Sequence, residues 1–223
     1  MALTLRPEEP AAGPWRIVSG SALLDLVLAT AHRPDRGPVV IAIDGRGGSG
    51  KSTLAGMLHR QASSSTVIPT DDLTWNEPLF AWGHLLDEVI GPLREGRALA
   101  YRPPRWQERG RNGILTARAG LDLVIVEGTG ASQREHMDMI DATIWVQADY
   151  IQAEHRGIAR DVESGINGDP EAATAFWHEW MTEELRFLRD QRPWERACVV
   201  VNGTPERHLA ANEVEIAPPL VRS

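Results

Sequence analysis

Residues 39–55 read VVIAIDGRGGSGKSTLA, and this stretch decides the fold. Residues 39–44 form a nearly continuous apolar run, which is typical of a strand buried on both faces of a parallel sheet. The pattern G-x-x-x-x-G-K-[ST] follows at once over residues 45–52. Residues 52–61 then carry apolar side chains at helical spacing. A strand that leads through a glycine-rich loop into a helix is the context in which this motif predicts phosphate binding.

The loop over residues 45–52 has the chemistry that a phosphate chain needs. Glycine lets the backbone turn where a side chain would clash, so successive amide hydrogens can point at phosphate oxygens. The start of the next helix adds unpaired amides and a positive end. Lys51 is expected to reach the outer phosphates, and Ser52 to ligate magnesium. The predicted nucleotide-binding residues are Gly45, Gly47, Gly48, Ser49, Gly50, Lys51, Ser52 and Thr53.

Strand and helix patterns alternate along the 223 residues, which predicts an α/β fold with a parallel sheet between two layers of helices. Residues 19–32 are expected to form a helix capped by Ser21. Residues 96–119 carry no clear periodicity and are expected to be irregular. The predicted organisation is an N-terminal extension and helix over 1–36, a main domain over 37–205, and a C-terminal tail over 206–223.

The net charge of −8 argues against nucleic acid as a partner, because nucleic-acid binding relies on clustered positive charge. No apolar run approaches the roughly 20 residues that cross a bilayer, and residues 1–13 do not resemble a signal peptide. We therefore expect a cytoplasmic protein without a membrane partner. Homo-oligomerisation stays open. The single cysteine, Cys198, excludes an internal disulfide.

Carboxylates follow two of the predicted strands. Asp71 and Asp72 come after the short strand over residues 66–69, and Glu127 ends the apolar run over 121–127. Strand ends gather at the ligand-binding edge of a parallel sheet. Asp71 or Asp72 can therefore accept a proton from an acceptor hydroxyl, and Glu127 can hold the magnesium shell. The alternatives are a helix cap for the acidic pair and a solvent-facing side chain for Glu127.

Two arginines share one face of the helix predicted over residues 150–164. Arg156 and Arg160 lie four positions apart, and they belong to a predicted flap around residues 150–170. Arginines on such a flap can neutralise the charge of a phosphoryl group in transfer. The alternative is a solvated helix face.

These motifs, in this order, resemble the P-loop small-molecule kinases of the uridine kinase, phosphoribulokinase and pantothenate kinase group. The resemblance covers residues 39–203. It is carried by residues 41–55, Thr70-Asp71-Asp72, Tyr101, Val124-Ile125-Val126-Glu127-Gly128, Arg156-x-x-x-Arg160-Asp161 and Val201-Asn202-Gly203.

The resemblance implies a three-layer P-loop NTPase fold with a five-stranded parallel sheet. It also implies ATP with Mg²⁺ as phosphate donor and a hydroxyl group of a small molecule as acceptor. By position, Asp71 is the base, Glu127 the Walker B acid, and Arg156 and Arg160 the flap arginines. Lys51 completes the predicted catalytic set. Ser52 and Glu127 are the predicted metal-binding residues.

The segment that binds the acceptor in uridine kinases contains a Tyr followed by a His and an Arg, and here it differs. It begins with Tyr101, and Trp106 lies near the position of the His. The acceptor therefore stays open. Six arginines fall between residues 97 and 118, which favours either a wall for an anionic acceptor or a solvated loop. The predicted substrate-binding residues are Asp72, Tyr101, Arg105, Trp106 and Arg109.

The tryptophans allow two interpretations. Trp75 and Trp106 either stack against a ligand or pack in a core, whereas Trp177 and Trp180, three apart on one helix, are expected to pack. The alternative function is a P-loop ATPase or a nucleotide-binding regulatory protein without a small-molecule acceptor. A GTP switch would carry Asn-Lys-x-Asp as its guanine reader, and residues 202–205, NGTP, do not match it.

Overall fold

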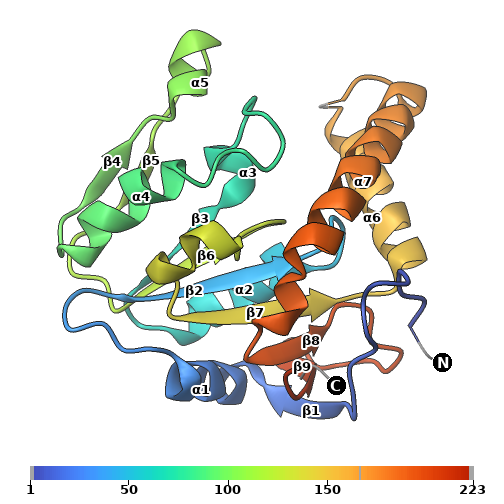
Figure 1. Cartoon of the computed structure of the whole chain (residues 1–223), viewed down its shortest axis with the longest axis horizontal. Coiled ribbons are helices and arrows are strands. Elements are labelled where there is room, and N and C mark those ends of the chain that lie inside the picture. Colours follow the sequence, from blue (N-terminus) through green and yellow to red (C-terminus); the bar gives the residue numbers. More distant parts are fainter. Residues whose placement is uncertain (1–2, 166, 221–223) are drawn as a thin grey trace.

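The computed structural model of the chain describes residues 3–165 and 167–220 and has a seven-stranded sheet with helices on both faces (Figure 1). The strands stand in the order β1-β9-β8-β7-β2-β6-β3. Their bounds are β1 Arg16–Ser19, β2 Val39–Gly45, β3 Ser65–Pro69, β6 Leu123–Glu127, β7 Ala142–Gln147, β8 Val199–Asn202 and β9 Glu213–Ala217. The strands from β8 to β3 are parallel, which confirms the predicted five-stranded parallel sheet.

Two antiparallel strands extend this sheet from the expected five strands to seven. β9 pairs with β8, and β1 pairs with β9, so that Arg16 lies opposite Ile216. The N-terminal extension and the tail therefore join the main sheet at one edge. The division of the chain into extension, main domain and tail stays a prediction. Residues 1–2, 166 and 221–223, which the predicted extension, flap and tail include, lie outside the described residues.

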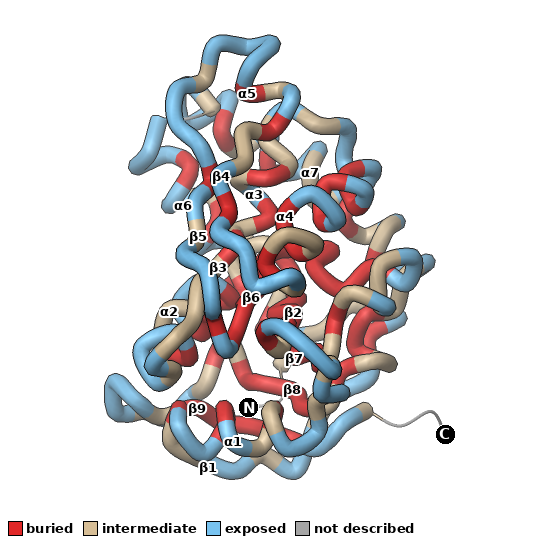
Figure 2. Tube along the Cα trace, turned by 90° about the vertical axis from the view of Figure 1, so that its left-hand side faces the viewer, coloured by how far each residue is buried: buried red, intermediate tan, exposed pale blue. Residues whose placement is uncertain are grey.

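The helices sort onto the two faces because apolar side chains alternate along the central strand. Ile41 and Ile43 of β2 pack in the core beneath α1 and α2, whereas Val40 and Ala42 pack in the core beneath α4. Figure 2 shows the buried residues concentrated along the central strands. None of the described helices has the length and apolar character to span a bilayer. The α-helices are α1 Gly20–Thr30, α2 Lys51–Gln61, α3 Thr70–Leu73, α4 Leu85–Arg94, α5 Pro104–Glu108, α6 Tyr150–Ser164 and α7 Pro170–Gln191, and the 3-10 helices are η1 Arg134–Met139 and η2 Pro193–Glu195.

Helix α1 begins at Gly20, before the residue that was expected to cap it. The side chain of Ser19, not Ser21, accepts a hydrogen bond from the amide of Ala22 and caps α1. Ser19 also ends β1 and has extended backbone, which is the conformation that an N-cap residue adopts. The prediction of Ser21 as the cap was wrong because β1, which fixes the entry into the helix, was not visible in the sequence.

The segment over residues 96–119 is ordered, contrary to the expectation of an irregular stretch. β4 Leu99–Tyr101 and β5 Leu115–Ala117 pair as a separate two-stranded antiparallel sheet, with α5 between them. Leu99, Trp106 and Leu115 are buried in the core that contains α4. We call residues 70–117, from α3 to β5, the hairpin lobe. In Figure 1 it rises at the upper left of the view, and α6 and α7 rise at the upper right.

Candidate active site

The glycine-rich loop connects the central strand β2 to α2, as predicted, and its backbone depends on glycine. Gly48 and Gly50 have φ angles of 71° and 99°, in the left-handed region that favours glycine. A Cβ atom on Gly48 would lie 2.0 Å from the carbonyl oxygen of Ala153 in α6. Gly50 precedes α2, whose N-terminus has no side-chain cap. The first amides of α2 are therefore left for another acceptor.

Lys51 is buried at the start of α2 and is held by the loop itself. Its Nζ atom donates to the carbonyl oxygen of Arg46 at 2.8 Å and lies 3.4 Å from the hydroxyl of Thr129. Thr129 in turn donates to the carbonyl oxygen of Gly45 at 3.0 Å. The lysine ammonium is thus fixed across the loop, between its beginning and the segment after β6.

Asp44 joins the phosphate loop to the segment after β6, a role that the sequence analysis missed. Its carboxylate is buried and accepts hydrogen bonds from the amides of Gly45, Gly130 and Ser132 and from the Ser132 hydroxyl, at 2.7–3.0 Å. A buried carboxylate must be satisfied in this way because burial of an unpaired charge is strongly unfavourable. The aspartate in an otherwise apolar strand was the signal that could have revealed it.

The residues of this loop fit a polyphosphate with a divalent cation. The hydroxyl of Ser49 is buried and has no hydrogen-bond partner in the described structure, so it is a donor inside the loop awaiting an acceptor. The uncapped amides of α2 and the ammonium of Lys51 are further donors at the same end of the helix. The side chains of Ser52 and Glu127 supply the hard oxygen atoms that Mg²⁺ prefers.

Glu127 ends β6 beside the loop, which places the two predicted metal-binding residues together. Burial raises the pKa of the Glu127 carboxyl, and the negative charge of Asp71 raises it further. The positive charges of Lys51 and Arg160, and a hydrogen bond from Ser52, offset only part of this rise. Gly128 follows with a φ of 148°, and a Cβ atom there would lie 1.7 Å from the hydroxyl oxygen of Thr70. This close approach brings the start of α3, and with it Asp71, to Glu127.

The acidic pair lies in α3, a short helix that directly follows β3, so the two side chains have different surroundings. Asp71 is exposed and acts on the Glu127 carboxyl. Asp72 forms an ion pair with Arg111, and its carbonyl oxygen accepts a 2.9 Å hydrogen bond from Trp106 Nε1. Asp71 therefore influences the Glu127 carboxyl, whereas Asp72 is bound to Arg111 and Trp106 within the hairpin lobe.

Arg111 is the arginine that the structure brings to the acidic pair, and it was not among the predicted site residues. Its guanidinium lies 3.8 Å from the ring centroid of Trp106 and 5.3 Å from that of Trp75. Both tryptophans therefore pack against a charged group of the protein. Cation–π contacts and the bond to Asp72 fix the guanidinium in one place.

The other predicted substrate-binding residues are distributed differently. Arg105 is tied by Glu108 at 2.7 Å and by Glu77 at 3.6 Å, and Arg109 is exposed beyond α5. Tyr101 is half-buried on β4, and burial, with Glu88 and Glu77 nearby, raises the pKa of its hydroxyl. The predicted substrate-binding roles of these residues stay predictions.

The predicted flap arginines lie on α6 as expected and are held by neighbouring groups. Arg156 donates to the carbonyl oxygen of Gly203 at 2.8 Å, which connects α6 to the loop after β8. Arg160 is paired with Asp161 at 3.0 Å, and its charge contributes to the pKa of Glu127. Closure of either arginine on a phosphoryl group stays a prediction.

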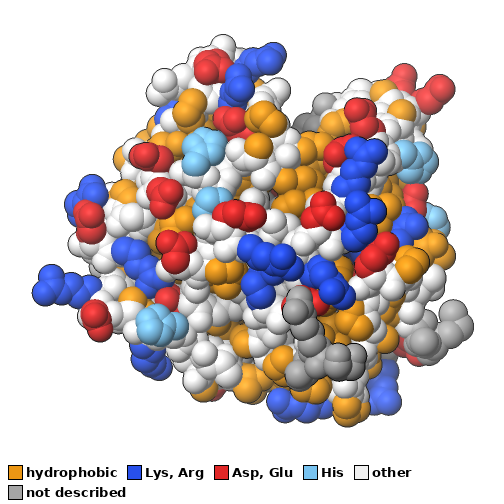
Figure 3. All heavy atoms as spheres, in the orientation of Figure 1, with side chains coloured by type: hydrophobic (Ala, Val, Ile, Leu, Met, Phe, Trp, Pro, Cys, Tyr) orange, Lys and Arg blue, Asp and Glu red, His pale blue; other side chains and the backbone are white. Residues whose placement is uncertain are grey.

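Helix α7 covers the loop and reaches the hairpin lobe. Trp177 is buried against α6, where a Cβ atom on Gly157 would lie 1.9 Å from its ring, which confirms the packing role predicted for it. Trp180 and Phe187 contact the ring of Phe80, with Phe80 stacked on Phe187 at 3.9 Å. Figure 3 shows the surface hollowed between the hairpin lobe and α6–α7, with hydrophobic side chains in the hollow.

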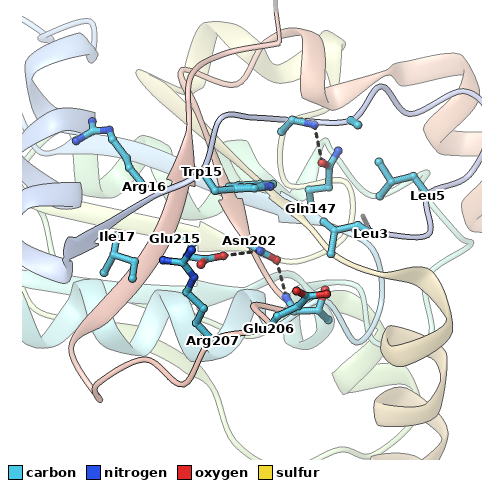
Figure 4. Close-up of a pocket in the computed structure, with 13 residues that line it drawn as sticks. Leu3, Leu5, Trp15, Arg16, Ile17, Gln147, Asn202, Glu206, Arg207 and Glu215 are labelled. Carbon is cyan, nitrogen blue, oxygen red and sulfur yellow. Dashed lines mark hydrogen bonds between the residues drawn. The ribbon is translucent and has the colours of Figure 1, made fainter. Parts of the chain in front are cut away.

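A separate cavity of about 490 Å³ lies beside the loop after β8, between the N-terminal segment and β9 (Figure 4). Its lining includes Leu3, Trp15, Asn202 and Glu215 and no residue of the phosphate loop. The Asn202 side chain donates to Glu215 at 2.7 Å and accepts from the amide of Thr204 at 3.0 Å. These polar groups are therefore already satisfied within the protein.

The parallel sheet, the glycine-rich loop between its central strand and α2, and the acid at the end of β6 define a P-loop NTPase fold. No family model and no curated protein sequence matches the chain. Among solved structures, it resembles a protein from Silicibacter sp. TM1040 described as a candidate fructose transport system kinase, with 21% identity, a TM-score of 0.49, and coverage of 71% of this chain and 87% of that one. It also resembles a protein from Bacillus stearothermophilus described as a possible uridine kinase, with 19% identity, a TM-score of 0.49, and coverage of 81% and 96%. Neither likeness identifies a reaction or an acceptor for this chain.

Proposed function

We propose that the protein is an ATP-dependent kinase that transfers the γ-phosphate to a hydroxyl group of a small molecule. The observation that carries the proposal is the position of Asp71 and Glu127 beside the phosphate loop. Glu127 lies opposite Pro69 of β3 on one side and Ile43 of β2 on the other, and the Thr70 side chain packs against Gly128, so α3 begins next to Glu127. A regulatory nucleotide-binding protein without turnover needs the loop and the metal-binding acid only, whereas a second, exposed carboxylate beside them can accept a proton from an attacking hydroxyl group. This arrangement favours phosphate transfer over nucleotide binding alone, and a test with and without acceptors separates a kinase from an ATPase.

The residues of the chain divide the work of the transfer. The loop amides and Lys51 bind the phosphate chain, and bound Mg²⁺ would supply charge neutralisation at its outer oxygens while Ser52 and Glu127 hold it. Asp71 accepts the proton of the acceptor hydroxyl as that oxygen bonds to the γ-phosphorus and the bond to the ADP oxygen breaks. Arg156 and Arg160 on α6 are the candidates for the positive charge that closes over the site.

The acceptor lies, in this proposal, in the hollow between the hairpin lobe and α6–α7. Arg111 is the residue best placed to select it, because its guanidinium is fixed by Asp72 and by Trp106 next to the proposed base. One bond to Asp72 leaves other N–H groups of the guanidinium available. We infer a small acceptor with a phosphate or carboxylate group, bound through Arg111 rather than through Arg105 or Arg109.

The test is a screen of purified protein with Mg-ATP and a panel of nucleosides, vitamins, sugars and sugar phosphates, with ADP release as the readout. Acceptor-dependent ADP release, with phosphate recovered on the acceptor, supports the proposal. Steady ADP release without an acceptor would identify an ATPase, and nucleotide binding without turnover a regulatory protein.

Asp71 and Asp72 provide a matched pair of variants for the base. Asp71→Asn is expected to lower turnover by about 100-fold or more, the usual contribution of a general base, with nucleotide affinity little changed. Asp72→Asn releases Arg111 and is expected to raise KM for the acceptor more than it lowers turnover. Full turnover by Asp71→Asn would refute the assignment of the base.

A further inference from the structure

The second residue of the phosphate loop, Arg46, is buried between two acids from distant parts of the chain. Its Nε atom donates to Glu9 at 3.1 Å, and its Nη1 atom lies 3.8 Å from an oxygen of Glu184. Only 6% of its side chain is exposed. The guanidinium is therefore committed to contacts within the protein, whereas the carbonyl oxygen of the same residue accepts the bond from Lys51.

Glu9 is anchored on both of its oxygen atoms. One accepts the bond from Arg46, and the other accepts from Trp145 Nε1 at 2.8 Å and from Gln147 Nε2 at 3.1 Å. Trp145 and Gln147 belong to β7, which pairs directly with β2. The N-terminal segment thus places a fully buried carboxylate on the rigid sheet, at the base of the phosphate loop.

Glu184, on α7, contacts the phosphate loop directly. Its Oε1 atom accepts a short hydrogen bond, 2.6 Å, from the amide of Gly47, and its Oε2 atom faces Arg46. There is little free space here, because a Cβ atom on Gly47 would lie 3.0 Å from the ring of Trp177. Burial raises the pKa of the Glu184 carboxyl, and Arg46, the Gly47 amide and Lys51 oppose that rise.

Stability alone does not explain this arrangement. Two buried carboxylates face one guanidinium, and for buried ion pairs the loss of hydration often offsets the attraction. A similar contact through apolar side chains would hold the segments together at least as well. The charged network instead fixes the geometry of the loop, because its hydrogen bonds are directional and hold the Arg46 guanidinium and the Gly47 amide in defined positions.

We propose that Glu9 and Glu184 are positioning residues that hold Arg46 and Gly47, so that the loop amides and Lys51 are preset for a nucleoside polyphosphate. Arg46 acts through the conformation of the loop and not by contact with phosphate. The N-terminal segment is then a functional part of the nucleotide site. This proposal rests on the nucleotide-binding part of the proposed function and does not depend on the identity of the acceptor.

The test is the affinity for Mg-ATP and ADP, measured by titration calorimetry on the full chain. Glu9→Gln and Arg46→Gln are each expected to weaken binding by roughly ten-fold or more, since small displacements of a binding group have large effects. The double variant is expected to be no weaker than the worse single variant, because both changes break one network. Arg46→Lys, which keeps the charge, is expected to recover part of the affinity.

Two neighbouring glutamates serve as matched controls. Glu8 is exposed beside Glu9, and Glu183, with 41% of its side chain exposed, pairs with Arg186 beside Glu184. Glu8→Gln and Glu183→Gln are expected to bind nucleotide as the parent does. Loss of folded protein would lower the calorimetric stoichiometry, whereas mispositioning lowers the affinity of each folded molecule. If Glu9→Gln folds poorly, Glu184→Gln provides the same comparison from the other side of Arg46.

Unchanged or tighter binding by Glu9→Gln, together with weaker binding by Arg46→Gln, would overturn the proposal and make Arg46 a direct phosphate ligand. Additive losses in the double variant would also overturn it. Absence of nucleotide binding by the parent would refute both this proposal and the proposed function. Nucleotide binding with the expected variant pattern but without acceptor-dependent turnover would support the positioning role and refute the kinase.

Discussion

Trp106 Nε1 donates a 2.9 Å hydrogen bond to the carbonyl oxygen of Asp72, which ties α5 to the acidic pair in α3. Trp106→Phe keeps a ring for Arg111 but removes this donor from the partly buried Asp72 carbonyl. We expect the free energy of unfolding to fall by about 1–3 kcal/mol, measured by urea denaturation. Nucleotide affinity should not change, and KM for the acceptor should rise. An unchanged free energy of unfolding would show that the bond does not stabilise the lobe.

Gly157 permits the close approach of α6 and α7. A Cβ atom there would lie 1.9 Å from the buried ring of Trp177, so Gly157→Ala should separate the helices and lower the free energy of unfolding by about 1–3 kcal/mol. The control is Gly91→Ala in α4, where a Cβ atom would have no neighbour within 4 Å among the described residues beyond its own turn of the helix. Alanine favours a helix more than glycine does, so this control should gain up to about 1 kcal/mol. Equal stability of the two variants would contradict the packing argument.

Glu127 should lower the stability of the nucleotide-free protein near neutral pH. The pKa of its carboxyl is raised in the folded state, so its contribution to stability is fully present below the unfolded pKa and is lost as pH rises through the folded pKa. Glu127→Gln removes the buried charge. Its free energy of unfolding should match that of the parent near pH 4 and exceed it increasingly toward pH 8, while magnesium-dependent activity is lost.

The control for this prediction is Glu95→Gln, at a side chain that is 64% exposed and paired with Arg97. Its stability relative to the parent should change little with pH, since exposed ion pairs contribute little. A pH-independent difference between Glu127→Gln and the parent would argue against a desolvated carboxylate at residue 127.

Asp149 should stabilise the start of α6 at neutral pH. Its carboxylate accepts from the amides of Thr4, Ile151 and Gln152 at 2.9–3.1 Å. Burial alone would raise the pKa of this carboxyl, but the hydrogen bonds from Gln152, Thr4 and Ile151 outweigh burial and lower it. Asp149→Ala should lower the free energy of unfolding by about 0.5–2 kcal/mol at pH 7.

The pH dependence provides the check on this cap. A carboxyl with a lowered folded pKa contributes stability that is present above the unfolded pKa and is lost as pH falls through the folded pKa. The difference between parent and Asp149→Ala should therefore shrink in acid, as measured by urea denaturation at pH 7 and pH 3. Asp149→Asn, which keeps an acceptor oxygen, should lie between them at pH 7. A difference of constant size would argue against a role for the charge.

The parallel core and the phosphate loop could be predicted because their information is local. Residues 39–61 contain the apolar strand, the glycines with special backbone angles and the amphipathic helix in one continuous stretch. The bounds of α6 were also predicted correctly, since Asp149 caps its start and Gly165 ends it with a φ of 64°. These signals act within a few residues and do not depend on the rest of the chain.

The features that the sequence did not predict depend on residues that are far apart along the chain. β4 and β5 have three residues each, too few for a visible period, and they are stabilised by pairing with each other and by packing on α4. β1 could not be predicted for a similar reason, because its partner β9 lies at the other end of the described chain. The selection of Arg111 from six arginines, and of Glu184 from the acids of α7, depends on three-dimensional contacts that no sequence spacing encodes.

The pairing of β1 with β9 has a consequence for the folding kinetics. Arg16 and Ile216 are about 200 positions apart, so closing this contact carries the full loop-closure entropy of the chain. Contacts of such high contact order form slowly, and we expect the parallel strands to assemble first. Glu9 lies just before β1 and reaches Arg46 only when that edge has docked. A refolding chain should therefore regain its sheet before it regains the ability to capture a nucleotide.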